Sequence, residues 1–382
     1  MRRGHDVRGF ARRNAMPIIS VAAALATCAI VPPDAGYARY VDGATLGRLA
    51  CMLLAVSGLR VSGVFPALAS WFVARCASVR GVVGSIVGVT SLASMLVTND
   101  MALLALLPLG AACLFAMDRR ELIAPVFVLQ GIAANLCGML LPFGNPQNIY
   151  LSGMFGIDFG AFVCVMAPPF AISVVLVALG CLVLVPRGRT AATPPSQPLD
   201  RQRASAYGAL LVLCVATVLG VVPVLVCLAI CLAMTLLVER GPALVARTDW
   251  GLIVTFAAFF VFSGNLARVE VVQAAFAAWL AGGAFVPAAL LSQLISNVPA
   301  AIVLSRFTGD WAGLLAGVNV GGAGTPIASL ATLIVIAQYG VISRELGLAD
   351  SRPTMGRFLG MLCALNAACL AILLGAGVAL GW

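Results

Sequence analysis

The sequence predicts an all-α polytopic membrane protein. Of its 382 residues, 62% are hydrophobic and 10% are charged, whereas an ordinary soluble domain has about 25% charged residues. The apolar residues form runs that approach the roughly 20 residues of a transmembrane helix, enough for about 11 spans. Most charged residues lie between these runs, where basic side chains orient the helices. This distribution excludes a soluble globular protein and argues against nucleic acid as a partner.

The first half of the chain, residues 16–185, is predicted to form one transmembrane repeat after a cytoplasmic Arg-rich tail at 1–15. The segment after this tail is expected to stay as a membrane helix and not to be removed as a signal sequence, because many spans follow it. The segment 61–76 is short and amphipathic, which suits the membrane interface. In order, the predicted segments are 16–31, 45–59, 61–76, 82–117, 122–155 and 159–185.

The second half, residues 205–382, is predicted to form a second transmembrane repeat. A hydrophilic cytoplasmic linker at 186–204, rich in Pro, Thr, Ser and Arg, separates the two halves. The second amphipathic segment carries Arg268 and Glu270 near its start, and we expect these two side chains to pair at the interface. The segments are 205–220, 224–238, 250–264, 266–280, 285–304, 311–339 and 356–380.

Polar interruptions occur in the same order in the two halves. Thr98-Asn99 aligns with Ser296-Asn297, and the segment 142–149 aligns with 326–333. With the N-terminus inside, most of the 23 basic residues fall on the cytoplasmic side, as the positive-inside rule requires. The halves then enter the membrane from opposite sides, as in many secondary transporters. The sequence therefore predicts two inverted repeats, each with a re-entrant hairpin and a broken transmembrane helix.

The four interruptions predict one central binding site. A helix is broken at membrane depth only where protein or a water-filled cavity satisfies the exposed backbone groups. Half-helix N-termini can hold an anion, and the freed carbonyl oxygens can coordinate a cation. Alternatively, a Ser or Thr in a membrane helix only bonds the carbonyl of the preceding turn. The residues expected to bind substrate or ion are Ser94, Thr98, Asn99, Asp100, Asn145, Gln147, Asn148, Ser296, Asn297, Thr325, Ser329 and Thr332.

Asp100 is the acidic residue with long uncharged apolar runs on both sides. A carboxylate inside a membrane costs a few kcal/mol and usually marks an ion pathway. We expect Asp100 to carry the coupling ion, H+ or Na+, with a possible Na+ near Asn99, Asp100, Asn145 and Asn297. The alternative is a structural Asp that caps a helix beginning at Met101.

Signatures of enzymes are nearly absent. The single histidine, His5, lies in the Arg-rich tail, and neither a zinc-protease motif nor a nucleophile-elbow motif occurs. Most of the 12 cysteines lie inside apolar runs and are interpreted as small buried hydrophobic residues. No cofactor is expected beyond the coupling ion. A membrane-embedded enzyme and a channel stay open as alternatives of another class.

Four motifs in this order resemble the ion transporter superfamily, which includes arsenite permeases, citrate transporters and divalent anion:sodium symporters. The resemblance covers the chain from about Leu46 onward. The motifs are Ser94-Met95-Leu96-Val97-Thr98-Asn99-Asp100, Gly144-Asn145-Pro146-Gln147-Asn148, Ser296-Asn297-Val298-Pro299, and Gly317-Val318-Asn319-Val320-Gly321-Gly322 running on to Thr325-Pro326-Ile327-Ala328-Ser329-Leu330-Ala331-Thr332.

This resemblance implies a scaffold domain that forms a homodimer, a transport domain that moves like an elevator, and arms at 61–76 and 266–280 that link them. Hairpin tips of the sodium-coupled dicarboxylate branch resemble Ser-Asn-Thr, whereas this chain has Thr98-Asn99-Asp100 and Ser296-Asn297-Val298. The first of these tips is closer to the arsenite permease branch. The expected function is cation-coupled transport of a small organic anion, oxyanion or oxyacid across the bacterial inner membrane, with proton-coupled arsenite or antimonite efflux as the alternative.

Overall fold

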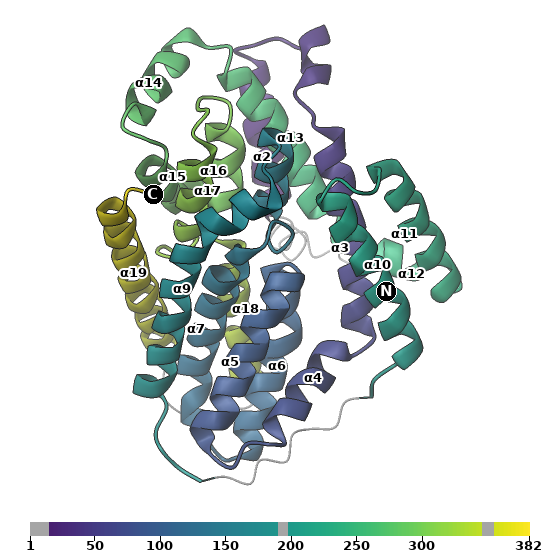
Figure 1. Ribbon diagram of the computed structural model, residues 1–382, viewed down its shortest axis with the longest axis vertical. Coiled ribbons are helices and arrows are strands. Elements are labelled where there is room, and N and C mark those ends of the chain that lie inside the picture. Colours follow the sequence, from purple (N-terminus) through teal and green to yellow (C-terminus); the bar gives the residue numbers. More distant parts are fainter. Residues whose placement is uncertain (1–14, 190–197, 346–354) are drawn as a thin grey trace, which may run out of the picture.

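The computed structural model describes residues 15–189, 198–345 and 355–382, and the regular elements in these ranges are helices (Figure 1). The predicted cytoplasmic tail, apart from its last residue, and the centre of the predicted linker lie outside the described residues. The main helices are α2 (Ala15–Cys28), α3 (Gly43–Val61), α4 (Val64–Val73), α5 (Val79–Leu96), α6 (Asn99–Ala116), α7 (Ile123–Ile132), α8 (Pro146–Phe155), α9 (Phe159–Leu184), α10 (Arg201–Val218), α11 (Val224–Val238), α12 (Ala243–Arg247), α13 (Gly251–Leu266), α14 (Glu270–Leu280), α15 (Phe285–Ile295), α16 (Asn297–Leu304), α17 (Trp311–Val320), α18 (Leu330–Glu345) and α19 (Met355–Leu380).

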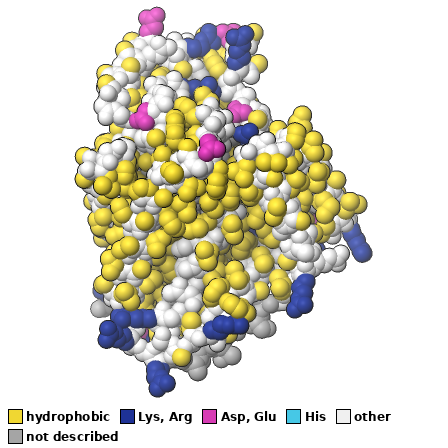
Figure 2. All heavy atoms as spheres, viewed as in Figure 1, with side chains coloured by type: hydrophobic (Ala, Val, Ile, Leu, Met, Phe, Trp, Pro, Cys, Tyr) yellow, Lys and Arg dark blue, Asp and Glu magenta, His cyan; other side chains and the backbone are white. Residues whose placement is uncertain are grey.

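Several of these helices are suited to cross a membrane. By length and composition, six spans in the described ranges qualify, and a seventh does if α13 and α14, bent by 98°, are counted as one. Other predicted segments form apolar helices of 10 to 17 residues, too short to meet the same test. Hydrophobic side chains cover a broad band of the surface and arginines gather toward its ends (Figure 2). The predicted all-helical, multi-pass membrane architecture is confirmed.

Helices stop at each of the four polar interruptions. A two-residue break separates α5 from α6, and Ser296 separates α15 from α16 with a φ of 76°. After α7 the chain forms a π-helical turn at Ala133–Cys137 and a 3-10 turn, and α8 starts only at Pro146. Pro142 and Pro146 lack the N–H that would continue the helix, which explains the long break here. Residues 321–329 separate α17 from α18 in the same way.

Elements from the two halves of the chain pack against each other. α18 contacts α6 and α7, and α16 contacts α8, so helices of the second half lie among those of the first. α10 and α11 pack on α3 at one side of the molecule (Figure 1). Gly58 lets α3 and α10 approach closely, because a Cβ at this position would lie 2.1 Å from the ring of Tyr207. The interleaving brings the helix breaks together in the centre.

Candidate functional site

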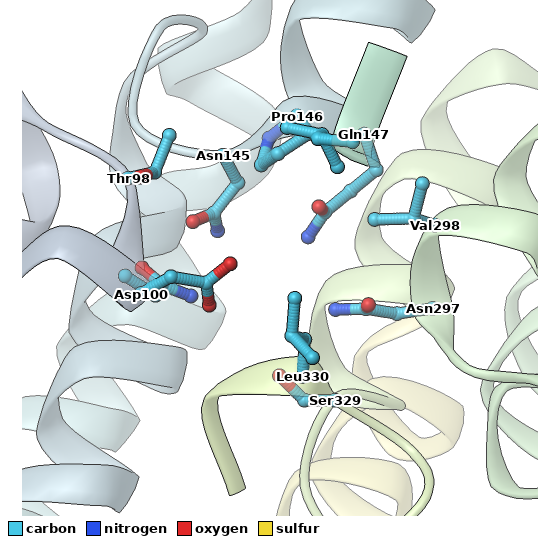
Figure 3. A pocket seen from close by; sticks show the side chains of 11 residues that line it. Thr98, Asp100, Asn145, Pro146, Gln147, Asn297, Val298, Ser329 and Leu330 are labelled. Atoms are coloured by element: carbon cyan, nitrogen blue, oxygen red, sulfur yellow. The ribbon is translucent and has the colours of Figure 1, made fainter. Parts of the chain in front are cut away.

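A small cavity of about 40 Å³ lies where the helix breaks meet (Figure 3). The side chains of Asp100, Asn145, Gln147 and Asn297 point toward its centre. Among the residues that the structure describes, Asp100 is the charged one that lines it, and no arginine does. The lining residues are Thr98, Asn99, Asp100, Asn145, Pro146, Gln147, Leu252, Asn297, Val298, Ser329 and Leu330. The structure therefore brings together seven of the predicted residues: Thr98, Asn99, Asp100, Asn145, Gln147, Asn297 and Ser329.

Four helix N-termini supply nearly all of this lining. They belong to α6, α8, α16 and α18, which begin at Asn99, Pro146, Asn297 and Leu330. The first N–H groups of a helix have no partner inside that helix, and they carry partial positive charge. Such an end binds an oxyanion or a polar oxygen without any basic side chain. The convergence of four of them makes the cavity attractive to an oxygen-rich ligand.

Asp100 lies inside the first turn of α6 and is not its cap. The helix begins at Asn99 and Thr98 occupies the N-cap position, where it makes no side-chain cap bond. The alternative in which Asp100 caps a helix beginning at Met101 is therefore wrong, because the helix starts two residues earlier. A carboxylate in the first turn interacts favourably with the helix dipole. Its position leaves the side chain free to face the cavity (Figure 3).

Asn319, which the sequence reasoning did not select, connects three of the predicted residues. Its Oδ1 accepts hydrogen bonds from Gln147 Nε2 at 3.1 Å and Asn145 Nδ2 at 3.4 Å. Its Nδ2 donates to Asn148 Oδ1 at 2.7 Å and to the Leu315 carbonyl at 2.9 Å. Asn319 is buried in α17. In the sequence, Asn319 is marked by being the single Asn in the Gly-rich segment before the fourth break.

Ser94 and Asn148 have structural partners and do not line the cavity. Ser94 Oγ donates to the Thr90 carbonyl at 2.8 Å. This bond to the preceding helical turn is the one expected of a Ser that does not bind substrate or ion. Asn148 Nδ2 donates to the carbonyls of Met139 and Leu141, both at 3.2 Å. Asn148 thereby satisfies two carbonyls that the second break exposes.

Three predicted residues of the second half also lie outside the cavity lining. Ser296 is buried at the hairpin tip, in a backbone conformation that is uncommon for a residue other than Gly. Thr325 is exposed, and its Oγ1 donates to the Gln293 carbonyl at 2.9 Å. Thr332 is buried in the first turn of α18. Gln293, also missed from sequence, holds the fourth break by donating to the carbonyls of Gly321 and Ala323.

Backbone oxygens gather beside Asn99. A Cβ at Gly144 would lie 2.4 Å from the Gly138 carbonyl oxygen, 3.1 Å from that of Met95 and 3.2 Å from that of Ser94. The Asn99 Oδ1 atom is buried, and within the described ranges no donor bonds to it. It would lie 2.5 Å from a Cβ at Gly138. Oxygens from carbonyl and amide groups are the ligands that small hard cations prefer.

A second group of buried amides lies near Gly322. A Cβ at this position would lie 2.8 Å from Asn135 Oδ1 and 3.0 Å from Asn297 Nδ2. Asn135 belongs to the π-helical turn of the first half, and neither polar atom of its side chain has a hydrogen-bond partner in the described part of the chain. A buried amide without hydrogen-bond partners carries a desolvation penalty of about 1–3 kcal/mol. Asn135 is therefore a functional candidate that the sequence reasoning missed.

A larger cavity of about 440 Å³ shares helix α6 with the site. Met101 and Leu104, from the same helix as Asp100, line one wall of it. The polar and charged groups on its other walls are Ser57, Arg60, Glu239, Arg247 and Asp249. Glu239 accepts a bond at 3.0 Å from Arg203.

The expected pairing of Arg268 with Glu270 is wrong. Arg268 Nη2 lies 2.8 Å from Asp34 Oδ2, and its Nη1 donates to the Tyr40 hydroxyl at 3.1 Å. The turn between α13 and α14 brings Arg268 over the loop that follows α2, which sequence spacing does not reveal. The hydrogen bond from Arg268 holds the pKa of Asp34 below its ordinary value of 3.8.

The family model described as "Citrate transporter" matches residues 9–310. The chain is 30% identical over 319 residues to the inner membrane protein YbiR of Escherichia coli, covering 78% of this chain and 80% of that protein. It is 29% identical over 280 residues to the uncharacterized transporter MJ0456 of Methanocaldococcus jannaschii, covering 72% and 73%. It is 26% identical over 343 residues to the uncharacterized transporter Rv2684 of Mycobacterium tuberculosis, covering 78% of both. With its apolar helices, these matches identify the chain as a multi-pass inner-membrane transporter that belongs to the citrate transporter family.

Proposed function

We propose that the protein is a secondary active transporter that moves a small oxyanion or oxyacid, coupled to H+ or Na+, by alternating access. One observation carries this proposal: four helix N-termini converge on a cavity whose charged side chain is the single carboxylate of Asp100. The helix N-termini attract the oxygen atoms of a substrate, and the carboxylate binds a cation or a proton.

The size and charge of the cavity favour a small substrate. About 40 Å³ holds a few water molecules or an anion of similar size. A substrate with several carboxylates would also need compensating charge, and no arginine in the described ranges lines the cavity. A monovalent oxyanion, or a neutral oxyacid whose hydroxyls donate to Asp100, needs only the helix ends and the amides of Asn145, Gln147 and Asn297.

Asp100 links substrate binding to the coupling ion. Two negative charges about 4 Å apart repel each other by roughly 4 kcal/mol at an effective dielectric constant of 20. An anion in this cavity therefore binds best when Asp100 is protonated or when a cation lies beside it. The anion in turn raises the affinity of the same group for that proton or cation, because coupling between sites is reciprocal. This reciprocity is what cation-coupled transport requires.

For Na+, the stronger binding site lies where the first break meets the second. Near Gly144 lie the carbonyl oxygens of Ser94, Met95 and Gly138. Near Gly138 lies Asn99 Oδ1, to which no donor in the described ranges bonds. Asp100 follows Asn99 and would add negative charge nearby. The second, weaker candidate is the amide group of Asn135 and Asn297 at Gly322.

Two inverted repeats, with the N-terminus inside, would explain the symmetry of these groups. In the alignment of 142–149 with 326–333, Asn135 corresponds to Asn319 and Gly138 to Gly322. Each of these asparagines reaches residues of the opposite half, Asn135 near Asn297 and Asn319 at Gln147. In this orientation Arg60 lies on the cytoplasmic side, so the 440 Å³ cavity would give access to the site from the cytoplasm.

For the movement we propose an elevator. A scaffold of α3, α10 and α11 would stay fixed in a homodimer, and the helices around the cavity would move against it. The short α4 and the bent α14 would act as arms. The 98° bend between α13 and α14 supports this role, since an arm must lie along the membrane surface.

The test is thermal stabilisation of the purified protein by arsenite, citrate, succinate and sulfate, each in Na+ and in K+ at equal ionic strength. A ligand at 100 times its dissociation constant adds about 2.7 kcal/mol of stability. We expect a shift with a small oxyanion or oxyacid and none with citrate. A shift with citrate alone, present only in Na+, would overturn the substrate class and support the second candidate, a sodium-coupled carboxylate transporter.

That second candidate rests on the family description, since the matching model is that of citrate transporters. It requires the cavity to enlarge when the substrate binds. Proton-coupled efflux of arsenite or antimonite is the form of the first proposal in which Asp100 carries the proton. An arsenite shift without Na+ dependence would support this form.

A further inference from the structure

We propose that four cysteines between α3, α10 and α11 form a binding site for a thiophilic d10 metal ion, Zn2+ in the first instance. The cluster consists of Cys51 from α3, Cys214 from α10, and Cys227 and Cys231 from α11. All four are free thiols and buried. They lie away from the transport cavity, whose lining contains none of them.

Three of the four sulfur atoms lie close enough together to hold a metal ion, and the fourth lies beside one of them. Cys231 Sγ lies 3.8 Å from Cys214 Sγ and 3.9 Å from Cys227 Sγ. The sulfurs of Cys51, Cys227 and Cys231 lie within 4.8 Å of one another, and Cys214 does not belong to this group although it contacts Cys231. Four thiolates at the usual Zn–S length of about 2.3 Å have S···S separations of about 3.8 Å. A bound metal therefore needs the Cys214 sulfur to move closer to the other sulfurs.

The arrangement follows from three packed helices. Cys227 and Cys231 are four residues apart, so they lie on the same face of α11. α10 and α11 both pack on α3, and also on each other, which brings the other two cysteines to this face. A disulfide needs sulfurs about 2.05 Å apart, much closer than those found here. Each bond to the metal replaces an S–H bond and releases one proton, and four thiolates on Zn2+ leave the site with a net charge of −2.

A bound ion would fasten α10 and α11 to α3. Thiolate ligands favour Zn2+ and Cu+ over hard cations such as Mg2+ and Ca2+. Four sulfurs in a tetrahedron favour Zn2+, whereas Cu+ needs fewer ligands. Because the cluster is buried, the ion is expected to enter as the protein folds and to exchange slowly afterwards.

The first test uses the intact protein, purified in mild detergent under reducing conditions from cells supplied with Zn2+. We expect about one zinc per chain, in keeping with one four-sulfur site. After removal of the metal, Co2+ should produce a thiolate-to-cobalt charge-transfer band. The Cys231→Ser variant should lose this band, while Cys113→Ser, which replaces a buried cysteine outside the cluster, should keep it. Copper without zinc in the purified protein would assign the site to Cu+.

A second measurement avoids variants that fail to fold. Thiol alkylation of the unmodified protein, mapped by mass spectrometry, should show Zn2+ protecting Cys51, Cys214, Cys227 and Cys231, with the exposed Cys164 labelled throughout. The proposal is overturned if the four thiols react equally with and without Zn2+ and no charge-transfer band forms with Co2+. A disulfide mapped within the cluster under reducing conditions would also overturn it.

Discussion

Asn319 Nδ2 donates to Asn148 Oδ1 at 2.7 Å, although 171 residues of chain separate the two. The bond joins α17 of the second half to α8 of the first, beside two of the four helix breaks. Asn319 Oδ1 meanwhile accepts from Gln147, which lines the cavity. One buried amide thus sets the positions of side chains that would face the substrate.

Replacement of Asn319 by Ala should destabilise the protein and weaken substrate binding. Gln147 and Asn148 would each lose a buried partner, at a cost of about 1–3 kcal/mol. The matched control is Asn366→Ala, because Asn366 is also buried but its side chain, within the described ranges, donates to a carbonyl of its own helix. Thermal unfolding with and without ligand measures both effects. Equal losses in the two variants would show that Asn319 has no special role at the site.

Asp100→Asn should abolish coupling while the protein stays folded in the membrane. The amide has nearly the same shape but cannot carry the charge that links cation and anion. Coupling energies between sites are typically 1–3 kcal/mol, so gradient-driven uptake into proteoliposomes should fall by about 5- to 150-fold. The control is Glu121→Gln, which changes an exposed acidic residue. Full gradient-driven uptake by the Asp100 variant would contradict the coupling role.

Gly144→Ala should remove stabilisation by Na+ or, if the ion is H+, disrupt the second break. The added Cβ would lie 2.4 Å from the Gly138 carbonyl oxygen, so this backbone must move. Gly375→Ala is the control, since a Cβ there meets no atom within 4 Å and alanine favours a helix. Melting temperatures in Na+ and K+ separate the two effects. A variant with an unchanged Na+ response would exclude the carbonyl group near Gly144 as the cation site.

The ion pair of Asp34 and Arg268 should contribute stability at neutral pH and lose it in acid. Arg268 holds the pKa of Asp34 below 3.8 in the folded protein, so the unfolded state binds the proton first as the pH falls. As the pH falls, the stability that the ion pair contributes therefore begins to decline near pH 3.8 and vanishes below the pKa of Asp34 in the folded protein. The difference in melting temperature between the native protein and Asp34→Asn should follow this course and shrink in high salt. A difference that stays constant to the lowest pH would contradict the assignment.

Local chemistry made the helices and their interruptions predictable. Pro142 and Pro146 lack the backbone N–H that continues a helix, and here one helix ends before Pro142 and the next begins at Pro146. Thr98 and Asn145 are residues that favour helix starts, and α6 and α8 begin directly after them. The partner of Arg268 could not be predicted in this way, because Asp34 reaches it only through packing of α2 on α13.

The sequence by itself determined that this protein is helical, crosses a membrane and breaks four of its helical segments at polar residues. These features depend on composition and on neighbours along the chain. Only the tertiary structure decided that the N-termini of α6, α8, α16 and α18 face one cavity. It also decided that Asn319 and Asn135 reach the opposite half, because their neighbours are set by how α17 and the π-helical turn pack across the two halves. Such contacts join residues far apart in the chain, and no local pattern encodes which of them will meet.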